Sequence, residues 1–189
     1  TLHRNGSRGT LEMLSMQDIP LRLEVVEKLC TYIELNGLRV EGILRLSGTS
    51  DLVSELWAQL KLPVEEIDLR SYSVHVVAGA LKQYLRFQPL ITGAVADDFL
   101  ASVDEAMAET EEELRLKKLC TAVVGFPDEV IWFFRPIWLL MNQLYANGKF
   151  NKMTAKGLSI IVSVIIMELP AAAFLSGRNQ VYQDAFEIL

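Results

Sequence analysis

The sequence predicts an all-α fold, arranged as a single bundle of about eight or nine helices. Apolar residues recur with the helical period of about 3.6 residues in one segment after another. Proline and glycine separate most of these segments. The sequence contains no convincing pair of strands, no internal repeat and no low-complexity tract. Helices packed on helices are therefore the architecture to expect.

Length and composition indicate one globular domain. The 189 residues suffice for a single core, and we expect a loose tail over residues 1–9 and the domain over residues 10–189. Hydrophobic residues make up 51% of the chain and charged residues 22%, as in folded rather than disordered proteins. The net charge of −6 argues against a general nucleic-acid-binding surface. We expect a monomer that does not bind nucleic acid.

No targeting or membrane-spanning segment is visible. Residues 1–9 are polar and basic, without the apolar core of a signal peptide. The most apolar run, residues 158–167, is shorter than the roughly 20 residues that a bilayer span needs. Cys30 and Cys120 lie in apolar helical patterns and suit small buried residues of a reducing compartment. We therefore expect a cytoplasmic domain without direct membrane insertion.

The first segments alternate between turn and helix. Residues 10–16 suit a short amphipathic turn or helix, and Pro20 is well placed to open a long helix over residues 21–36. Gly37 would then cap this helix in the left-handed conformation. The apolar stripe of this helix consists of Val25, Val26, Leu29, Tyr32 and Ile33.

A second helix is predicted to begin between Ser47 and Asp51. Ser47, Thr49 and Ser50 all offer side-chain oxygens for the N-cap, and Pro63 stops the helix. Its inner face is predicted to consist of Leu52, Val53, Leu56, Trp57 and Leu60.

A third helix is predicted over residues 74–87, with Ser73 as its N-cap and Pro89 as its stop. Lys82 and Arg86 are four residues apart in this helix, so both project from one side.

Five further helices follow. Residues 97–110 and 111–124 have amphipathic patterns, and residues 130–145 form a long aromatic helix that Pro136 should kink or split. Asn147-Gly148 is a turn signal.

Thr154 is expected to cap a helix over residues 155–168. Pro170 and Gly177 then mark a loop, and residues 181–189 form the last predicted helix.

Between the first two helices, the short stretch bounded by Gly42 and Gly48 carries a single arginine, Arg45. Glycine allows a sharp turn and a close approach to a partner, so this loop could carry the arginine out of the fold. The alternative is a linker whose arginine is simply solvated, since arginine is common on surfaces.

A self-contained active site is absent from the sequence. There is no phosphate-binding glycine loop and no dinucleotide motif. Two histidines and two scattered cysteines offer no metal-ligand spacing, so we expect no metal and no cofactor. His75 lies beside valines and is interpreted as a half-buried residue at a helix start. Any chemistry would therefore be completed by a partner.

Three ordered blocks of sequence carry a family resemblance. Residues 26–48 end in Glu-Gly-Ile-Leu-Arg-Leu-Ser-Gly, and residues 74–86 contain Leu-Lys-Gln-Tyr-Leu-Arg. Residues 151–154 read Asn-Lys-Met-Thr and precede an apolar helix. In this order and spacing, the blocks closely resemble the Rho-type GTPase-activating (RhoGAP) domain, over about residues 11–167.

The resemblance implies an all-α domain that activates a GTPase and is not itself an enzyme. Its implied partner is a Rho-family small GTPase in the GTP-bound state, and Arg45 occupies the family's arginine-finger position. The family's lysine and arginine in the second block brace the finger loop and meet the switch regions of the GTPase. These residues correspond here to Lys82 and Arg86. The partner-binding residues implied by the resemblance are Gly42, Ser47, Gly48, Lys82 and Arg86.

The sequence also departs from the family pattern. Leu44 stands where phenylalanine usually precedes the finger and keeps an apolar anchor, while residues 87–90 shorten the segment after Arg86 and should remodel that corner. Gly157 and Ile165 replace two asparagines, the later of which helps to position the finger in active members. Isoleucine cannot form hydrogen bonds through its side chain. A modest misplacement of a catalytic group costs about 10²-fold in rate.

Two alternatives therefore remain open beside a GTPase activator. The first is a catalytically weak or inactive module that docks on a small GTPase or on another protein. The second is a scaffold whose acidic charge and aromatic helix serve a different partner.

Overall fold

A computed structural model describes residues 19–167 and 179–189. The tail predicted for residues 1–9, the short helix or turn at 10–16 and the loop marked by Pro170 and Gly177 lie outside these residues. Within the described part, nine α-helices and one 3₁₀ turn confirm the all-α class. The elements are α2 (Leu23–Gly37), α3 (Ser50–Gln59), η1 (Val64–Glu66), α4 (Val74–Phe87), α5 (Gly93–Met107), α6 (Glu112–Val124), α7 (Asp128–Ala146), α8 (Gly148–Asn151), α9 (Ala155–Ile166) and α11 (Asn179–Ile188).

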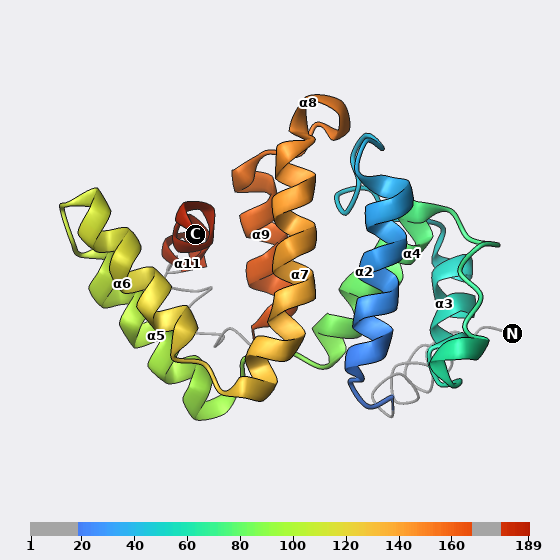
Figure 1. The fold of residues 1–189 in the computed structure, drawn as a ribbon, viewed down its shortest axis with the longest axis horizontal. Helices are drawn as coiled ribbons and strands as arrows, with labels where there is room; N and C mark the ends of the chain where they lie inside the picture. The colour runs from blue at the N-terminus through green and yellow to red at the C-terminus, as the bar shows by residue number, and fades with distance from the viewer. Residues whose placement is uncertain (1–18, 168–178) are drawn as a thin grey trace, which may run out of the picture.

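The helices form an elongated bundle with α7 and α9 at its centre (Figure 1). At one end α2 packs on α4 and α7, and α3 packs on α4. At the other end α5 and α6 form an antiparallel pair, and α11 packs on both α5 and α9. The loop from α2 to α3 and the short α8 meet at the same end of the central helices (Figure 1).

The core follows the predicted apolar stripes. Val25, Val26, Leu29 and Ile33 of α2 are fully buried, and burial of a large aliphatic side chain contributes about 1.5–3 kcal/mol. The inner face of α3 is confirmed with one correction: Leu52 is 42% exposed, because it lies outside the stripe that faces α4.

Gly37 is buried and belongs to α2, so the prediction of a left-handed cap is wrong. The residue that follows, Leu38, has right-handed helical angles. A Cβ on Gly37 would lie 2.8 Å from Cγ2 of Val74. Glycine is therefore needed here for the close approach of α2 to the start of α4.

Pro136 lies inside a helix that continues without a break from Asp128 to Ala146, so the predicted split does not occur. Tertiary packing overrides the local penalty of a proline, since Phe134 and Ile137 on either side of it are buried.

Two helix starts differ in their capping. Thr154 caps α9 as predicted, because its Oγ1 accepts a hydrogen bond of 3.0 Å from the amide of Gly157. Ser73 is the N-cap residue of α4 by position, but its side chain makes no capping hydrogen bond.

α9 ends at Ile166, two residues before the predicted end. Met167 is extended and pairs with Ile91 in an isolated parallel bridge. The amide of Ile91 donates to the carbonyl of Ile166 at 2.9 Å, which joins the chain after α4 to the end of α9.

The two cysteines differ in burial. Cys30 is buried as expected, whereas Cys120 is exposed and corrects the prediction. The reason is the position of α6 at the edge of the bundle, where only Leu119 of this helix is buried.

Candidate functional site

The loop that joins α2 to α3 makes a tight turn around Gly42. The carbonyl oxygen of Gly42 accepts hydrogen bonds from the amides of Arg45 at 3.0 Å and Leu46 at 2.7 Å. Gly42 itself has φ +70°, a conformation that glycine adopts at little cost. The turn places Arg45 at the outer edge of the loop.

Buried residues on the inner side of this turn hold it against the bundle. Ile43 and Leu44 are both 0% exposed, whereas Arg45 is exposed. Leu44 keeps the apolar anchor expected at this position, and it does so at φ +65°. A left-handed conformation costs a non-glycine residue about 1–2 kcal/mol, so the surrounding contacts must fix it.

Lys82 provides one of these contacts. Its Nζ donates a hydrogen bond of 2.5 Å to the carbonyl of Leu44, the residue before Arg45. The side chain is half-buried, and this burial lowers the pKa of Lys82. The ammonium group of Lys82 thus holds the backbone next to Arg45.

Asn151 provides a second set of contacts. It is 0% exposed, and its Nδ2 donates to the carbonyls of Leu38 and Leu144, each at 2.8 Å. Its Oδ1 accepts from the amide of Met153 at 2.8 Å, and its backbone carbonyl accepts from the amide of Gly42 at 2.8 Å. One residue therefore ties the Arg45 loop to α7 and α8.

Sequence reasoning did not single out Asn151 as a site residue. The signal was present, because Asn151 opens the third sequence block that carries the family resemblance. Its role depends on a contact with Leu38 across 113 positions of the chain, which no local pattern encodes.

The side chain of Arg45 has no hydrogen bond and no ion pair with any residue that the structure describes. Gly48, at the far end of the loop, lies against the first turn of α4. A Cβ on Gly48 would lie 2.5 Å from Cγ2 and 2.8 Å from Cα of Val76. The loop is thus fixed at both ends while its guanidinium remains available.

An open groove of about 770 Å³ runs beside the loop between α3, α4 and α9. Ser47, Gly48, Lys82 and Arg86 line it together, whereas Gly42 and Arg45 do not. Gly42 is buried on the inner side of the turn. Arg86 is exposed at the groove, four residues beyond Lys82 on the same face of α4.

The α9 wall of this groove is apolar, formed by Ile160, Ile161, Val164 and Ile165. Ile165 is only 4% exposed and cannot offer a hydrogen bond at the position where the sequence departs from the family pattern. Gly157, the other departure, lies in the first turn of α9 and does not line the groove.

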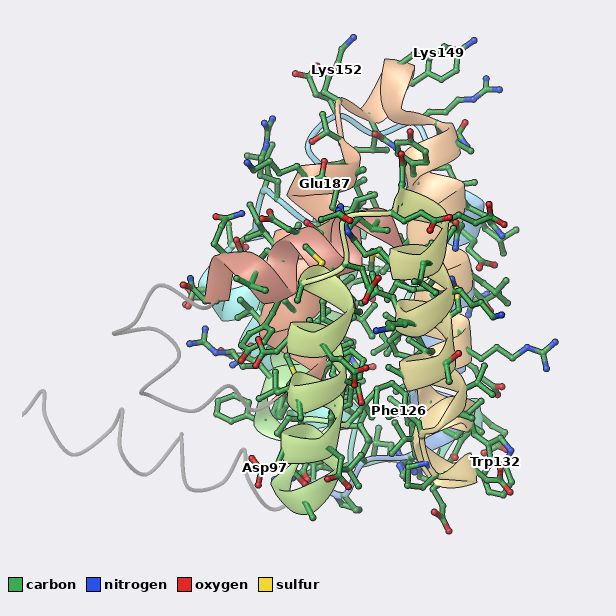
Figure 2. All side chains as sticks on the ribbon, turned by 90° about the vertical axis from the view of Figure 1, so that its left-hand side faces the viewer. Asp97, Phe126, Trp132, Lys149, Lys152 and Glu187 are labelled. Atoms are coloured by element: carbon green, nitrogen blue, oxygen red, sulfur yellow. The ribbon has the colours of Figure 1, made fainter. Side chains whose placement is uncertain are left out.

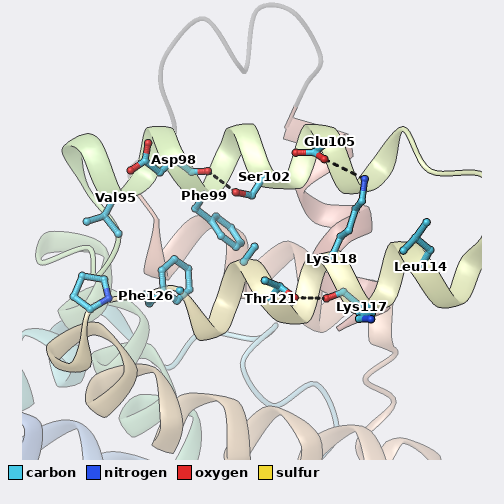
Figure 3. Close-up of a pocket in the computed structure, with 13 residues that line it drawn as sticks. Val95, Asp98, Phe99, Ser102, Glu105, Leu114, Lys117, Lys118, Thr121 and Phe126 are labelled. Atoms are coloured by element: carbon cyan, nitrogen blue, oxygen red, sulfur yellow. Dashed lines mark hydrogen bonds and ion pairs between the residues drawn. The ribbon is translucent and has the colours of Figure 1, made fainter.

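A second hollow of about 580 Å³ lies between α5 and α6 (Figure 3). One of its lysines is already paired, because Lys118 binds Glu105 at 3.1 Å and Glu109 at 2.9 Å. Ser102 donates to the carbonyl of Asp98 at 2.9 Å. Nothing in this hollow points to a ligand.

Other site classes find no support in residues 19–167 and 179–189. No group of three or more histidine, cysteine, aspartate or glutamate side chains there could hold a metal ion. None of the helices in this part is long and apolar enough to cross a membrane. His75 is half-buried in the first turn of α4, as interpreted from the sequence.

The fold and the loop define a helical domain that presents an arginine, free of contacts with the described residues, on a rigid turn. Comparison with known proteins agrees with this class. The sequence model of the RhoGAP domain matches residues 24–171. The chain therefore belongs to the RhoGAP domain family.

Curated relatives are similar over most of this chain. Unconventional myosin-IXa of Rattus norvegicus is 31% identical over 162 residues, which cover 85% of this chain and 6% of the myosin. Rho GTPase-activating protein gacN of Dictyostelium discoideum is 31% identical over 148 residues, which cover 77% of this chain and 24% of that protein. The chain thus spans about a quarter or less of these relatives.

Solved structures share the fold. The BH domain of GRAF, described as the GTPase regulator associated with focal adhesion kinase, superposes with a TM-score of 0.75 at 21% identity, covering 93% of this chain and 91% of that one. Human Rho GTPase activating protein 15 superposes with a TM-score of 0.74 at 20% identity, covering 98% of this chain and 95% of that one.

Proposed function

We propose that this domain accelerates GTP hydrolysis by a Rho-family small GTPase in its GTP-bound state, by inserting Arg45 in trans into the partner's nucleotide site. The main support for the proposal is the contrast between the fixed backbone of the Arg45 loop and the exposed side chain of Arg45. The backbone on either side of Arg45 is fixed by Lys82, Asn151 and Gly48, while the guanidinium is exposed and has no partner among the described residues. Family membership and the relative named as a Rho GTPase-activating protein support the same function.

The chemistry needs a cation more than it needs a new nucleophile. In phosphoryl transfer, charge spreads over the γ-phosphate oxygens, and a slow GTPase lacks a positive group placed to stabilise it. An arginine supplied by a partner is planar and always charged, and contributes roughly 10³–10⁵ in kcat. Because the water and the nucleotide belong to the GTPase, this domain acts as an activator of an enzyme.

Rigidity of the loop determines how much of that effect is realised. An arginine that must be ordered at the moment of reaction loses part of the gain to entropy and misplacement. Lys82 is a positioning residue in this scheme, because it holds the carbonyl next to Arg45. Arg86, Ser47 and Gly48 line the adjacent groove and are proposed to contact the switch regions of the GTPase.

The test is a single-turnover assay of GTP hydrolysis on several Rho-family proteins, with wild type, Arg45→Ala and the control Arg135→Ala. Arg135 is an exposed arginine of α7, remote from the loop. We expect Arg45→Ala to lose roughly 10³-fold of the acceleration and Arg135→Ala to behave as wild type. The proposal fails if wild type accelerates no Rho-family GTPase, or if Arg45→Ala remains fully active.

A second candidate is a module that binds a GTPase without accelerating hydrolysis. It is favoured by the apolar α9 wall, where Ile165 cannot help to orient the finger or the partner. Affinity for GTPase loaded with GDP, with GDP and aluminium fluoride, or with a non-hydrolysable GTP analogue separates the two candidates. An activator binds the transition-state mimic much more tightly, whereas a module binds the mimic and the GTP analogue equally. If the domain binds no small GTPase, the remaining function is that of a scaffold for another partner.

We further propose that the domain acts as a cytoplasmic monomer and that it neither binds nucleic acid nor inserts into membranes. The net charge of −6 supports the absence of a nucleic-acid surface. Sedimentation of the domain alone, with and without GTPase, tests the monomeric state.

A further inference from the structure

A cluster of exposed basic residues lies near Phe150 at the end of the molecule where α8 lies. Arg39 comes from the start of the Arg45 loop, and Lys149 and Lys152 come from α8 and the residue after it. Lys149 and Lys152 project outward at this end (Figure 2). We refer to Arg39, Lys149, Phe150 and Lys152 as the α8 basic patch.

The positive charges of the patch are held close together without a neutralising carboxylate. The guanidinium of Arg39 lies 4.7 Å and the Nζ of Lys149 lies 4.8 Å from the centroid of the Phe150 ring. The Nζ of Lys152 donates to the backbone carbonyl of Lys149 at 2.9 Å. None of the three cations forms an ion pair with a residue that the structure describes, including the exposed Glu41 nearby in sequence.

The close grouping of cations distinguishes the patch from the rest of the described surface. Exposed cations without an ion pair also occur at Lys117 and Arg135, but among the described residues two cations lie over one aromatic ring only at Phe150, in a chain whose net charge is −6. Two cations on one exposed aromatic ring repel each other, although cation–π attraction offsets part of that cost. An acidic surface that approaches the patch would remove the repulsion and gain two or three charge contacts.

The patch and Arg45 belong to one rigid unit. Asn151 lies between Lys149 and Lys152 in the chain, and it binds the Arg45 loop at both Gly42 and Leu38. The two parts also lie side by side at the same end of the bundle (Figure 1). A protein that receives Arg45 therefore meets the patch next to the point of insertion.

We propose that the α8 basic patch docks on an acidic protein surface beside the nucleotide site of the GTPase. This inference rests on the proposed function and adds a second contact region, distinct from the groove that Lys82 and Arg86 line. Exposed charges at the rim of an interface act mainly on association and on its salt dependence. The patch is therefore expected to set the affinity for the GTPase, while Arg45 sets the rate within the complex.

The experiment compares wild type, Lys149→Glu/Lys152→Glu, the neutral pair Lys149→Gln/Lys152→Gln, and the control Lys117→Glu/Arg135→Glu. The control changes net charge by the same amount on exposed residues of α6 and α7, away from the patch. Thermal unfolding confirms that each variant is folded. Single-turnover hydrolysis is then measured over a range of domain concentrations and at two ionic strengths.

We expect Lys149→Glu/Lys152→Glu to raise the half-saturating concentration on the order of tenfold, with an unchanged maximal rate and a weaker salt dependence. The neutral pair should give an intermediate shift, and the control should match wild type. Equal half-saturating concentrations for wild type and the reversed variant, while wild type remains an active GAP, would overturn the inference and leave the proposed function intact. Equal shifts in the reversed variant and in the control would also overturn it, because global charge would then be the cause.

The α8 basic patch could bind an anionic membrane instead of an acidic protein surface. Co-sedimentation with vesicles of phosphatidylcholine and phosphatidylserine measures binding of the domain to such a membrane. If the reversed variant loses vesicle binding and keeps the half-saturating concentration of wild type, the patch is a lipid contact and the inference is wrong. A wild-type domain that neither binds nor activates any Rho-family GTPase overturns the proposed function, and this inference falls with it.

Discussion

Replacing Lys82 by methionine should separate the placement of Arg45 from its charge. Methionine keeps the apolar stem of the side chain and removes the Nζ that donates to the carbonyl of Leu44 at 2.5 Å. A hydrogen bond from a charged donor contributes about 1.5–3 kcal/mol. The lowered pKa of Lys82 shows that burial of the ammonium group opposes this gain. The net change in the free energy of unfolding should therefore be small, within about 1 kcal/mol.

The effect on the loop should be larger than the effect on global stability. Leu44 is held at φ +65°, which costs about 1–2 kcal/mol, and its carbonyl bond to Lys82 opposes that cost. If the braced conformer loses about 1.4 kcal/mol, its population relative to relaxed loops falls about tenfold. We expect the maximal single-turnover rate of Lys82→Met to fall by at most about this factor, to a level above that of Arg45→Ala.

The assay is GTP hydrolysis by a Rho-family GTPase at saturating domain concentration, with Lys117→Met as the control. Lys117 is an exposed lysine of α6 outside the site. An unchanged maximal rate for Lys82→Met would refute the bracing role. A raised half-saturating concentration with an unchanged maximal rate would show instead that Lys82 serves only as a contact for the partner.

Three further results are expected. Gly48→Ala should lower the free energy of unfolding by about 1–3 kcal/mol, because the added Cβ would lie 2.5–2.8 Å from atoms of Val76, and a chemical denaturation curve like that of wild type would contradict this. Ile165→Asn should increase the maximal rate of GTP hydrolysis, because it places an amide in the groove wall, and should lower the free energy of unfolding. If the rate does not rise, the apolar wall does not limit activity. A thiol reagent should label Cys120 in the native state and Cys30 only after unfolding, because burial raises the pKa of Cys30 to about 12 from 9.0. As the pH rises, the thiol of Cys30 ionises in the unfolded chain before it ionises in the folded one. The free energy of unfolding is therefore unaffected by this thiol below pH 9 and falls as the pH rises from 9 toward 12. A Cys30→Ala variant should lack this part of the pH dependence.

Helix positions were predictable wherever a local pattern was strong. The pattern predicts the third helix over residues 74–87, where it is observed, because an amphipathic stripe ends at a proline stop. Ser73 holds the N-cap position without a capping hydrogen bond. The Thr154 cap likewise depends on an oxygen only three residues from the amide it accepts from. These features require no knowledge of the rest of the fold.

Errors arose where a residue's environment comes from another element. Gly37 looked like a helix cap, but the methyl group of Val74 explains why glycine is required there. Pro136 looked like a break, yet the packing around α7 keeps the helix continuous. Cys120 looked buried, but α6 lies at the edge of the bundle and exposes it.

The same distinction between local patterns and tertiary contacts applies to the candidate site. The sequence by itself determined an all-α chain of the RhoGAP type and the identity of its candidate arginine, because glycine spacing and the three ordered blocks are local features. Only the tertiary structure decided that Lys82 and Asn151 converge on the loop of Arg45 and that a basic patch lies beside it. The partners in those contacts are separated by 38 positions of the chain for Lys82 and Leu44, and by 113 positions for Asn151 and Leu38. Residues so far apart in the sequence come together only through the packing of whole helices.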